Sequence, residues 1–261
     1  AFSLTTAGGF ALRTFSNIAP GNYDVAQTLL AGYELFGAVC STDDTPNHVT
    51  VGAGEDVICG FFNVQQSSLT VVKNAVGGDG LFAFGGTLGA FNLTTSGGTA
   101  QQRFDNLLTG SYVISEAVPA GWYLDSAVCD NGDNPETLTL TPGQQVTCTF
   151  ANTRLSSITI VKEAVNGNDT FEFVSQALGN FSLTTTGGQA QRAFGALVSG
   201  IYDVSELATL GWLAGSASCS DGSDPAQIDL APGEAVTCTF TSQPVPTALP
   251  EEEEPAVTSN K

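Results

Sequence analysis

The chain has 261 residues, 30 of them glycine and none methionine, and it carries a formal net charge of −19. With only seven basic residues it offers no cationic surface for nucleic acid or anionic lipid, so we expect neither as a partner. No apolar run reaches the roughly 18 residues that a spanning helix needs, so we expect no membrane insertion. Frequent glycine, short alternating segments and no long helical period predict an all-β fold.

A repeat of about 90 residues organises the chain. GAFNLTTSGG at 89–98 matches GNFSLTTTGG at 179–188 and AFSLTTAGG at 1–9. Each repeat contains several short alternating segments separated by Gly, Pro, Asp or Asn turns, which is typical of a small β-sandwich. We therefore expect tandem sandwiches arranged as a rod, with repeat one at 1–66, repeat two at 67–154, repeat three at 155–243 and a Pro- and Glu-rich tail at 244–261.

The six cysteines fall into three pairs, and the members of each pair are 19 residues apart. No Cys-x-x-Cys pattern accompanies them and His48 is the only histidine, so we expect no zinc site. The equal spacing favours local disulfides, which indicate an oxidising, extracellular setting. The predicted bridges are Cys40–Cys59, Cys129–Cys148 and Cys219–Cys238.

The openings of the repeats differ. Repeats two and three begin with SLTVVKNAV (68–76) and SITIVKEAV (157–165), and repeat one shows no counterpart. A sandwich without its first strand exposes an unpaired sheet edge. Two explanations remain open: the sequence is a trimmed piece of a longer chain, or a neighbouring molecule supplies the strand.

Three predicted strands of repeat two direct a polar residue to the same side as apolar or core-type residues. YVISE at 112–116 reads as one alternating strand with Tyr112, Ile114 and Glu116 on one face, and Lys73 and Asn152 end similar patterns. Burial favours a neutral, nucleophilic amine and a protonated carboxyl group.

This trio can form a covalent bond. Attack of the Lys73 amine on the Asn152 carboxamide, with Glu116 polarising the carbonyl and moving protons, expels ammonia and leaves an isopeptide bond. The alternative is a buried ion pair between Lys73 and Glu116 without covalent chemistry.

The stretch YVISEAVPAGW at 112–122 resembles the E-box of Gram-positive pilins, and the 67–154 unit resembles the prealbumin-like domains akin to the B-repeats of collagen-binding adhesins. The resemblance implies an Ig-like or prealbumin-like β-sandwich with Lys on the first strand, a catalytic Glu in the E-box and Asn or Asp on the last strand. Lys73, Glu116 and Asn152 occupy these positions.

The other repeats depart from this pattern. Repeat three keeps Lys162 and Glu206, but Ser242 stands at the acceptor position and cannot form the amide. Repeat one keeps Asn63, has Gln27 in place of the Glu, and contains no lysine. We therefore expect the isopeptide reaction in repeat two alone.

The tail ends in PAVTSNK (255–261), which contains the third lysine of the chain. Aligning Lys261 with the lysines of the first strands places Val257 and Ser259 on the inward face. We hypothesise that the tail of one subunit fills the first-strand slot of repeat one in the next subunit, near Asn63 and Gln27. The alternative is a linker tail with an incidental final lysine.

Two weaker patterns concern ions and glycans. Asp- and Asn-rich turns follow the cysteines and are either calcium ligands or ordinary turn chemistry. The calcium candidates are Asp130, Asp133, Asp221 and Asp224, and the glycan acceptor sequons begin at Asn92, Asn168 and Asn180.

These observations predict a structural protein that is not an enzyme and has no cofactor. Because the chain has one histidine, at most one Ser/His/Asp catalytic triad could form. We expect a subunit of an extracellular or cell-surface filament, a pilus-like homopolymer assembled head to tail. The alternative is a spacer or stalk fragment of a larger cell-surface adhesin.

Overall fold

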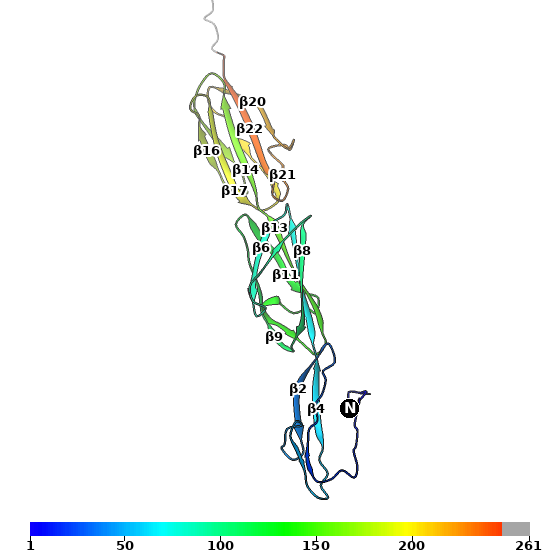
Figure 1. The fold of residues 1–261 in the computed structure, drawn as a ribbon. Coiled ribbons are helices and arrows are strands. Elements are labelled where there is room, and N and C mark those ends of the chain that lie inside the picture. The colour runs from blue at the N-terminus through cyan, green and yellow to red at the C-terminus, as the bar shows by residue number, and fades with distance from the viewer. Residues whose placement is uncertain (247–261) are drawn as a thin grey trace, which may run out of the picture. The chain divides into compact units, whose positions relative to one another are not determined.

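The computed structural model describes residues 1–246, and this part of the chain consists of strands, turns and a single 3-10 turn at Pro135–Thr137. The expected all-β fold is confirmed. Figure 1 labels many of the strands, and the chain divides into two compact units. None of the described residues forms a helix that is long and apolar enough to cross a membrane. The first unit combines 1–70, 103–112 and 137–147; the second holds 71–102, 113–136 and the described residues from 148 onward.

Repeat one contains two small antiparallel pairs, β1 with β3 and β2 with β4. Its buried apolar core consists of Cys40, Val49 and Val51. Residues 1–20 belong to no strand and carry one isolated bridge, between Ala7 and Phe10. The strands are β1 Gly21–Tyr23, β2 Tyr33–Cys40, β3 Val49–Val51 and β4 Cys59–Gln65.

Repeat two has three sheets, with strand orders β11-β13-β5-β8, β10-β6-β7 and β12-β9. Its strands are β5 Ser67–Val76, β6 Leu81–Gly86, β7 Phe91–Thr94, β8 Thr99–Leu107, β9 Gly110–Tyr112, β10 Ile114–Ala117, β11 Trp122–Cys129, β12 Leu138–Leu140 and β13 Gln145–Arg154.

Repeat three repeats this topology, with strand orders β17-β14-β22-β20, β16-β15-β19 and β18-β21. Its first strand is central, since β14 pairs antiparallel with β17 on one side and parallel with β22 on the other. The strands are β14 Ser156–Ala164, β15 Thr170–Val174, β16 Phe181–Thr184, β17 Gln189–Leu197, β18 Gly200–Tyr202, β19 Ser205–Glu206, β20 Trp212–Cys219, β21 Ile228–Leu230 and β22 Ala235–Pro244.

Alternation along β14 explains how a sandwich core forms from these strands. Ile158, Ile160 and Lys162 have no exposed surface, and the residues between them are partly exposed. The buried side faces Phe171, Phe173 and the other residues of a single apolar cluster. Because side chains alternate between the faces of a strand, the same alternation that buries the isoleucines also buries the lysine.

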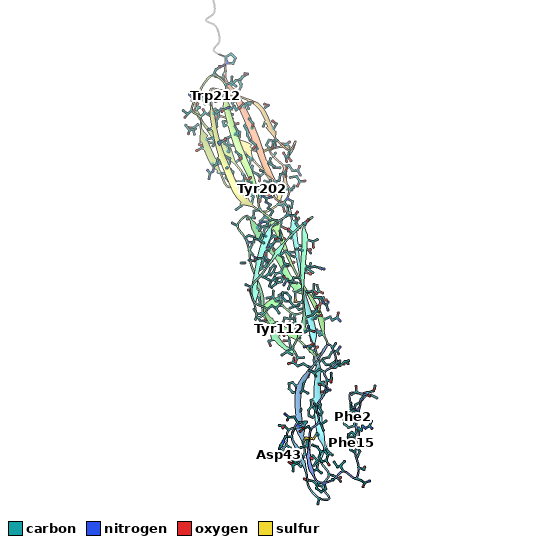
Figure 2. All side chains as sticks on the ribbon, in the orientation of Figure 1. Phe2, Phe15, Asp43, Tyr112, Tyr202 and Trp212 are labelled. Carbon is teal, nitrogen blue, oxygen red and sulfur yellow. A yellow bond between two sulfur atoms is a disulfide. The ribbon has the colours of Figure 1, made fainter. Side chains whose placement is uncertain are left out.

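The YVISE stretch is not one strand, in contrast to the sequence-based expectation. The ladder ends at Tyr112 in β9 and restarts at Ile114 in β10, and the two strands belong to different sheets. The Tyr112 hydroxyl donates to the carbonyl of Leu108 at 2.9 Å, and Tyr202 makes the matching bond in repeat three (both tyrosines are labelled in Figure 2). This tyrosine contact, a known corner device of β-sandwiches, fixes the chain where it changes sheets.

Candidate functional site

β5 carries Lys73 into the interior of repeat two. Leu69, Val71 and Lys73 lie on its buried face, and none has exposed surface. The Lys73 Nζ donates to the carbonyl of Phe150 at 3.1 Å and lies 4.4 Å from the centroid of the Phe82 ring. A lysine is almost never fully buried without a partner, so its surroundings must supply one or neutralise it.

The carboxamide of Asn152 is that partner, and it also contacts Glu116. Asn152 lies on β13 without exposed surface, and the Glu116 side chain on β10 is equally buried. Nζ of Lys73 donates to Oδ1 of Asn152 at 2.5 Å, and Nδ2 of Asn152 donates to Oε1 of Glu116 at 2.6 Å. The structure thus brings together the three residues selected from the sequence, with the amide between the amine and the acid.

Burial shifts the protonation of both ionisable groups. It lowers the pKa of Lys73 from 10.5 to about 8, although the nearby Glu116 carboxylate opposes the shift. It raises the pKa of Glu116 against the opposing attraction of Lys73. The second carboxyl oxygen, Oε2, is buried without a hydrogen-bond partner and lies 3.6 Å from Nζ. Both shifts favour the neutral amine and the protonated acid, the forms that amide exchange requires.

The contact made by Glu116 differs in one detail from the sequence-based expectation. Its carboxyl group contacts the amide nitrogen of Asn152 and not the carbonyl oxygen. This position suits protonation of the departing nitrogen better than polarisation of the carbonyl, whose oxygen accepts from Lys73. An acid beside the leaving group and an amine beside the carbonyl group are the two elements of acyl transfer.

Repeat three contains the matching site without an acceptor. Lys162 has no exposed surface, and its Nζ lies 2.7 Å from Oε1 and 2.9 Å from Oε2 of Glu206. Nζ also donates to the hydroxyl of Ser242 at 2.5 Å. Because serine is shorter than asparagine, the ammonium reaches the carboxylate directly. This site is an ion pair between a fully buried lysine and a partly exposed glutamate, without a carboxamide between them.

Two aromatic rings complete these sites and were not singled out from the sequence. Phe82 lies beneath Lys73, and Phe171 lies beneath Lys162 at 4.2 Å from Nζ. Trp122 contacts the Phe82 ring edge-on at 5.1 Å between centroids, and the tryptophan of repeat three contacts Phe171 in the same way. The signal was the recurrence of Phe-x-Phe, in LFAF and TFEF, in the two repeats that have a first-strand lysine.

Repeat one does not form a buried site of this kind. Asn63 on β4 and Gln27, which lies in no strand, both have exposed side chains. The tail residues Val257, Ser259 and Lys261 lie outside the described residues. Their proposed contact with repeat one therefore stays a prediction.

Each disulfide joins two cysteines that face each other directly across an antiparallel pair. They link Cys40 to Cys59 between β2 and β4, and the same bond recurs in the other repeats. The Cα–Cα distances are 3.9–4.0 Å. Each bond clamps the last strand of a repeat to its neighbour; the other two pairs are Cys129–Cys148 and Cys219–Cys238.

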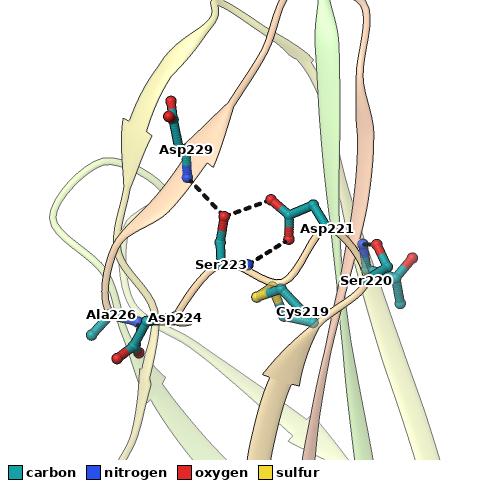
Figure 3. Close-up of a disulfide and its surroundings, with 9 residues drawn as sticks. Cys219, Ser220, Asp221, Ser223, Asp224, Ala226 and Asp229 are labelled. Atoms are coloured by element: carbon teal, nitrogen blue, oxygen red, sulfur yellow. Dashed lines mark hydrogen bonds between the residues drawn. A yellow bond between two sulfur atoms is a disulfide. The ribbon is translucent and has the colours of Figure 1, made fainter.

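The acidic turns beside the cysteines make local hydrogen bonds (Figure 3). Asp221 accepts from the main-chain nitrogen of Ser223 at 3.1 Å and from its hydroxyl at 2.6 Å, and the hydroxyl contact lowers the pKa of this carboxyl group. Asp224 accepts from the nitrogen of Ala226 at 2.9 Å. Residues 1–246 contain no group of three or more His, Cys, Asp or Glu arranged to hold a metal ion. Turn chemistry accounts for these hydrogen bonds, and calcium binding at the aspartates stays a prediction.

The three sequon asparagines are exposed. Asn92 lies on β7, and Asn168 and Asn180 precede β15 and β16. The Asn168 side-chain oxygen accepts from the nitrogen of Gly188 at 2.8 Å. Glycosylation at these exposed positions stays a prediction.

Repeats two and three are thus tandem β-sandwiches, each with a central first strand and an interior Lys–Glu pair. The sequence model of the prealbumin-like fold domain family matches residues 69–154 and, separately, 158–244. These segments make up more than half of the chain, which therefore belongs to this family. The expected fold class is confirmed for repeats two and three.

Several solved structures are similar at low identity. The Bacillus anthracis TIE protein is 16% identical over 78% of this chain, with a TM-score of 0.30, and the match spans 40% of that protein. The major pilin T-13 of Streptococcus pyogenes is 12% identical over 70% of this chain and 98% of its own, with a TM-score of 0.27. The shaft pilin SpaA of Lactobacillus rhamnosus GG is 10% identical over 71% of this chain and all of its own, with a TM-score of 0.26. No curated protein sequence matches the chain at a significant level.

Proposed function

We propose that the chain is a structural subunit of an extracellular filament, assembled head to tail by donation of a strand to repeat one. The observation that carries this proposal is the free edge of β4. Within the described residues β4 pairs with β2 alone, whereas its counterpart β22 lies between β20 and the first strand β14. Repeat one therefore has one strand position that no described residue fills.

The face around this edge is apolar and poorly covered. Val236, Cys238 and Phe240 of β22 are 5% exposed or less, but their counterparts in repeat one are only half-buried. Repeat one also exposes large apolar side chains on several of its segments. The most exposed are Phe10, Leu12, Leu30, Phe36 and Ile58, each with at least 66% of its surface accessible.

The proposed occupant is the tail of a second copy. Aligning Lys261 with Lys73 places Val257 at the position of Leu69 and Ser259 at that of Val71, a weak copy of the first-strand pattern that ends on the same inward lysine. Donation from one copy to the next is a heterologous contact, which produces an open filament and not a closed ring. The three disulfides support an extracellular location, and the family of structural domains supports a role other than enzymatic.

Electron microscopy of the purified chain tests this assembly. We expect filaments from the wild-type chain and none from Val257→Asp, which places a charge on the inward side of the donor segment. Thr258→Asp is the matched control, because it places the same charge on the outward side of the same segment. Equal filament formation by both variants would reject tail donation, and particles that remain single under all conditions would favour the spacer of a larger adhesin.

We also propose that repeat two matures by one internal crosslink. The neutral Lys73 amine attacks Cγ of Asn152, a C–N bond forms, and the amide nitrogen leaves as ammonia with protons relayed by Glu116. The Asn152 carboxamide contacts both reacting partners: its Oδ1 is 2.5 Å from Nζ of Lys73, and its Nδ2 is 2.6 Å from Oε1 of Glu116. The intact mass should be lower by one ammonia than the mass of the chain with its three disulfides, and Glu116→Gln should restore the unreacted mass. An unreduced mass in the wild-type chain would leave the buried ion pair as the correct description.

A further inference from the structure

The N-terminal segment of repeat one has the side-chain arrangement of β16 and β17 in repeat three, although it forms no strand itself. The rings of Phe2 and Phe15 meet edge-on at 5.0 Å (Figure 2). Phe181 and Phe194, which occupy the same positions on β16 and β17, meet edge-on at 5.1 Å. Arg13 lies over its two rings at 5.5 and 5.3 Å, as the arginine of β17 does over Phe181 and Phe194.

The backbone of this segment also matches β17. The bridge between Ala7 and Phe10 corresponds to the bridge between Thr186 and Gln189 at the turn before β17. Asn17 has a φ of 59°, and Ala196 in repeat three has a φ of 56°. In repeat three this left-handed residue lies at the register shift between β17 and β14. Asn17 thus has the conformation of a β-bulge although no ladder runs beside it.

The strand that would complete this ladder is absent from the described residues. β17 has β14 as its only neighbour in the sheet, with Phe194 opposite Ile158 and Arg192 opposite Ile160. In repeat one the corresponding residues 10–18 pair with no strand, and Phe15 remains 52% exposed. The segment is shaped for an interaction that repeat one alone does not provide.

We infer that the donated strand is bound on two sides, parallel to β4 and antiparallel to residues 10–18, so that its arrival orders the N-terminal segment as the outer strand of a four-stranded sheet. This inference rests on the proposed function and specifies the receiving surface. By the register of repeat three, the donor lysine lies beside Phe61 on one side and Ala11 on the other, and the residue two positions earlier lies beside Arg13. The partner is an extended segment of a second copy, and its binding is coupled to folding.

Trypsin provides a direct test, since Arg13 is the only tryptic site before Lys73. The receiver is the full-length Val257→Asp chain, whose own tail cannot compete, and the probe is a synthetic peptide with the sequence of residues 255–261. We expect saturating peptide to slow cleavage after Arg13 by about tenfold or more, because a ladder protects its backbone. Arg192 is the internal control: it lies at the same position in an existing ladder, so its cleavage should be slow with or without peptide.

Binding of a fluorescent form of the peptide, measured by anisotropy, separates the two proposals. Binding without protection of Arg13 would reject the two-sided site and leave tail donation in place. Absence of binding would overturn both. A second comparison uses the receiver itself: Phe15→Asp should weaken peptide binding by about tenfold, whereas Ser16→Asp, on the opposite face, should not. Equal affinity for both variants would also reject the two-sided site.

Discussion

Oδ1 of Asn152 is 2.5 Å from Nζ of Lys73, whereas Oε2 of Glu116 is 3.6 Å from the same nitrogen. The carboxamide therefore contacts the Lys73 amine more closely than the Glu116 carboxyl group does. In repeat three a serine replaces the amide, and Lys162 contacts Glu206 at 2.7 Å. The chain thus contains the same Lys–Glu pair twice, once with a carboxamide beside it and once without. The two repeats can therefore be compared to test whether the amide is what permits crosslinking.

Replacing Asn152 by serine should convert the site of repeat two into that of repeat three. We expect the variant to lose no ammonia, because no acceptor is left. A covalent link between positions 79 residues apart restricts the unfolded chain, so its loss should lower the free energy of unfolding by about 4 kcal/mol. Intact-mass measurement and urea denaturation test both effects, with Asn92→Ser on the exposed side of β7 as the control. A wild-type chain no more stable than the variant and of unreduced mass would contradict the crosslink.

The rate of crosslinking should depend on pH as a bell-shaped curve. The reactive pair, neutral Lys73 and protonated Glu116, holds one proton in total. Above the Lys73 pKa of about 8 the pair loses that proton, and below the raised pKa of Glu116 it gains a second one. The rate should therefore fall on both sides. Intact-mass time courses of newly synthesised chain at different pH values measure it, and a rate that keeps rising above pH 8 would show that the amine acts without the acid.

Strand alternation and repeat spacing predicted much of this site. They could not predict contacts that depend on how the strands are arranged in space. Equal cysteine spacing identified cross-strand pairs, and alternation along β5 placed Lys73 on the buried side. Alternation does not show where a chain leaves one sheet for another, so the break after Tyr112 was missed. Nor does it show what lies across the core, so Phe82 beneath the lysine was missed too. The match of residues 1–18 to β16 and β17 depends on contacts between rings and on single φ angles, which only coordinates provide.

Introducing an acceptor into repeat three should create a second reactive site. Ser242→Asn places a carboxamide where the serine hydroxyl now contacts Nζ of Lys162. Because Lys162 is fully buried and Glu206 lies beside it, we expect the loss of a second ammonia. Ser242→Ala, which removes the hydroxyl without adding an acceptor, should not change the ammonia count. A folded Ser242→Asn chain that loses only one ammonia would show that Lys, Glu and Asn in this fold do not suffice for the reaction.

The position of Glu116 depends on a glycine in the neighbouring strand. Gly86 has a φ of 129°, and a Cβ there would lie 1.9 Å from the carbonyl oxygen of Val113. Since Gly86 is opposite Ile114, Gly86→Ala should displace β10 just before Glu116. We expect a loss of about 2 kcal/mol in the free energy of unfolding and slower crosslinking.

Gly85→Ala is the matched control, because a Cβ at this position has no neighbour within 4 Å. Thermal or urea unfolding gives the stability of each variant, and the intact mass gives its crosslinked fraction. Normal crosslinking in Gly86→Ala would mean that the carboxyl group tolerates displacement of its strand. Slow crosslinking in Gly86→Ala but not in Gly85→Ala, with Lys73 and Asn152 unchanged, would show that the reaction requires Glu116 to be held against the amide nitrogen and not merely to be present in the core.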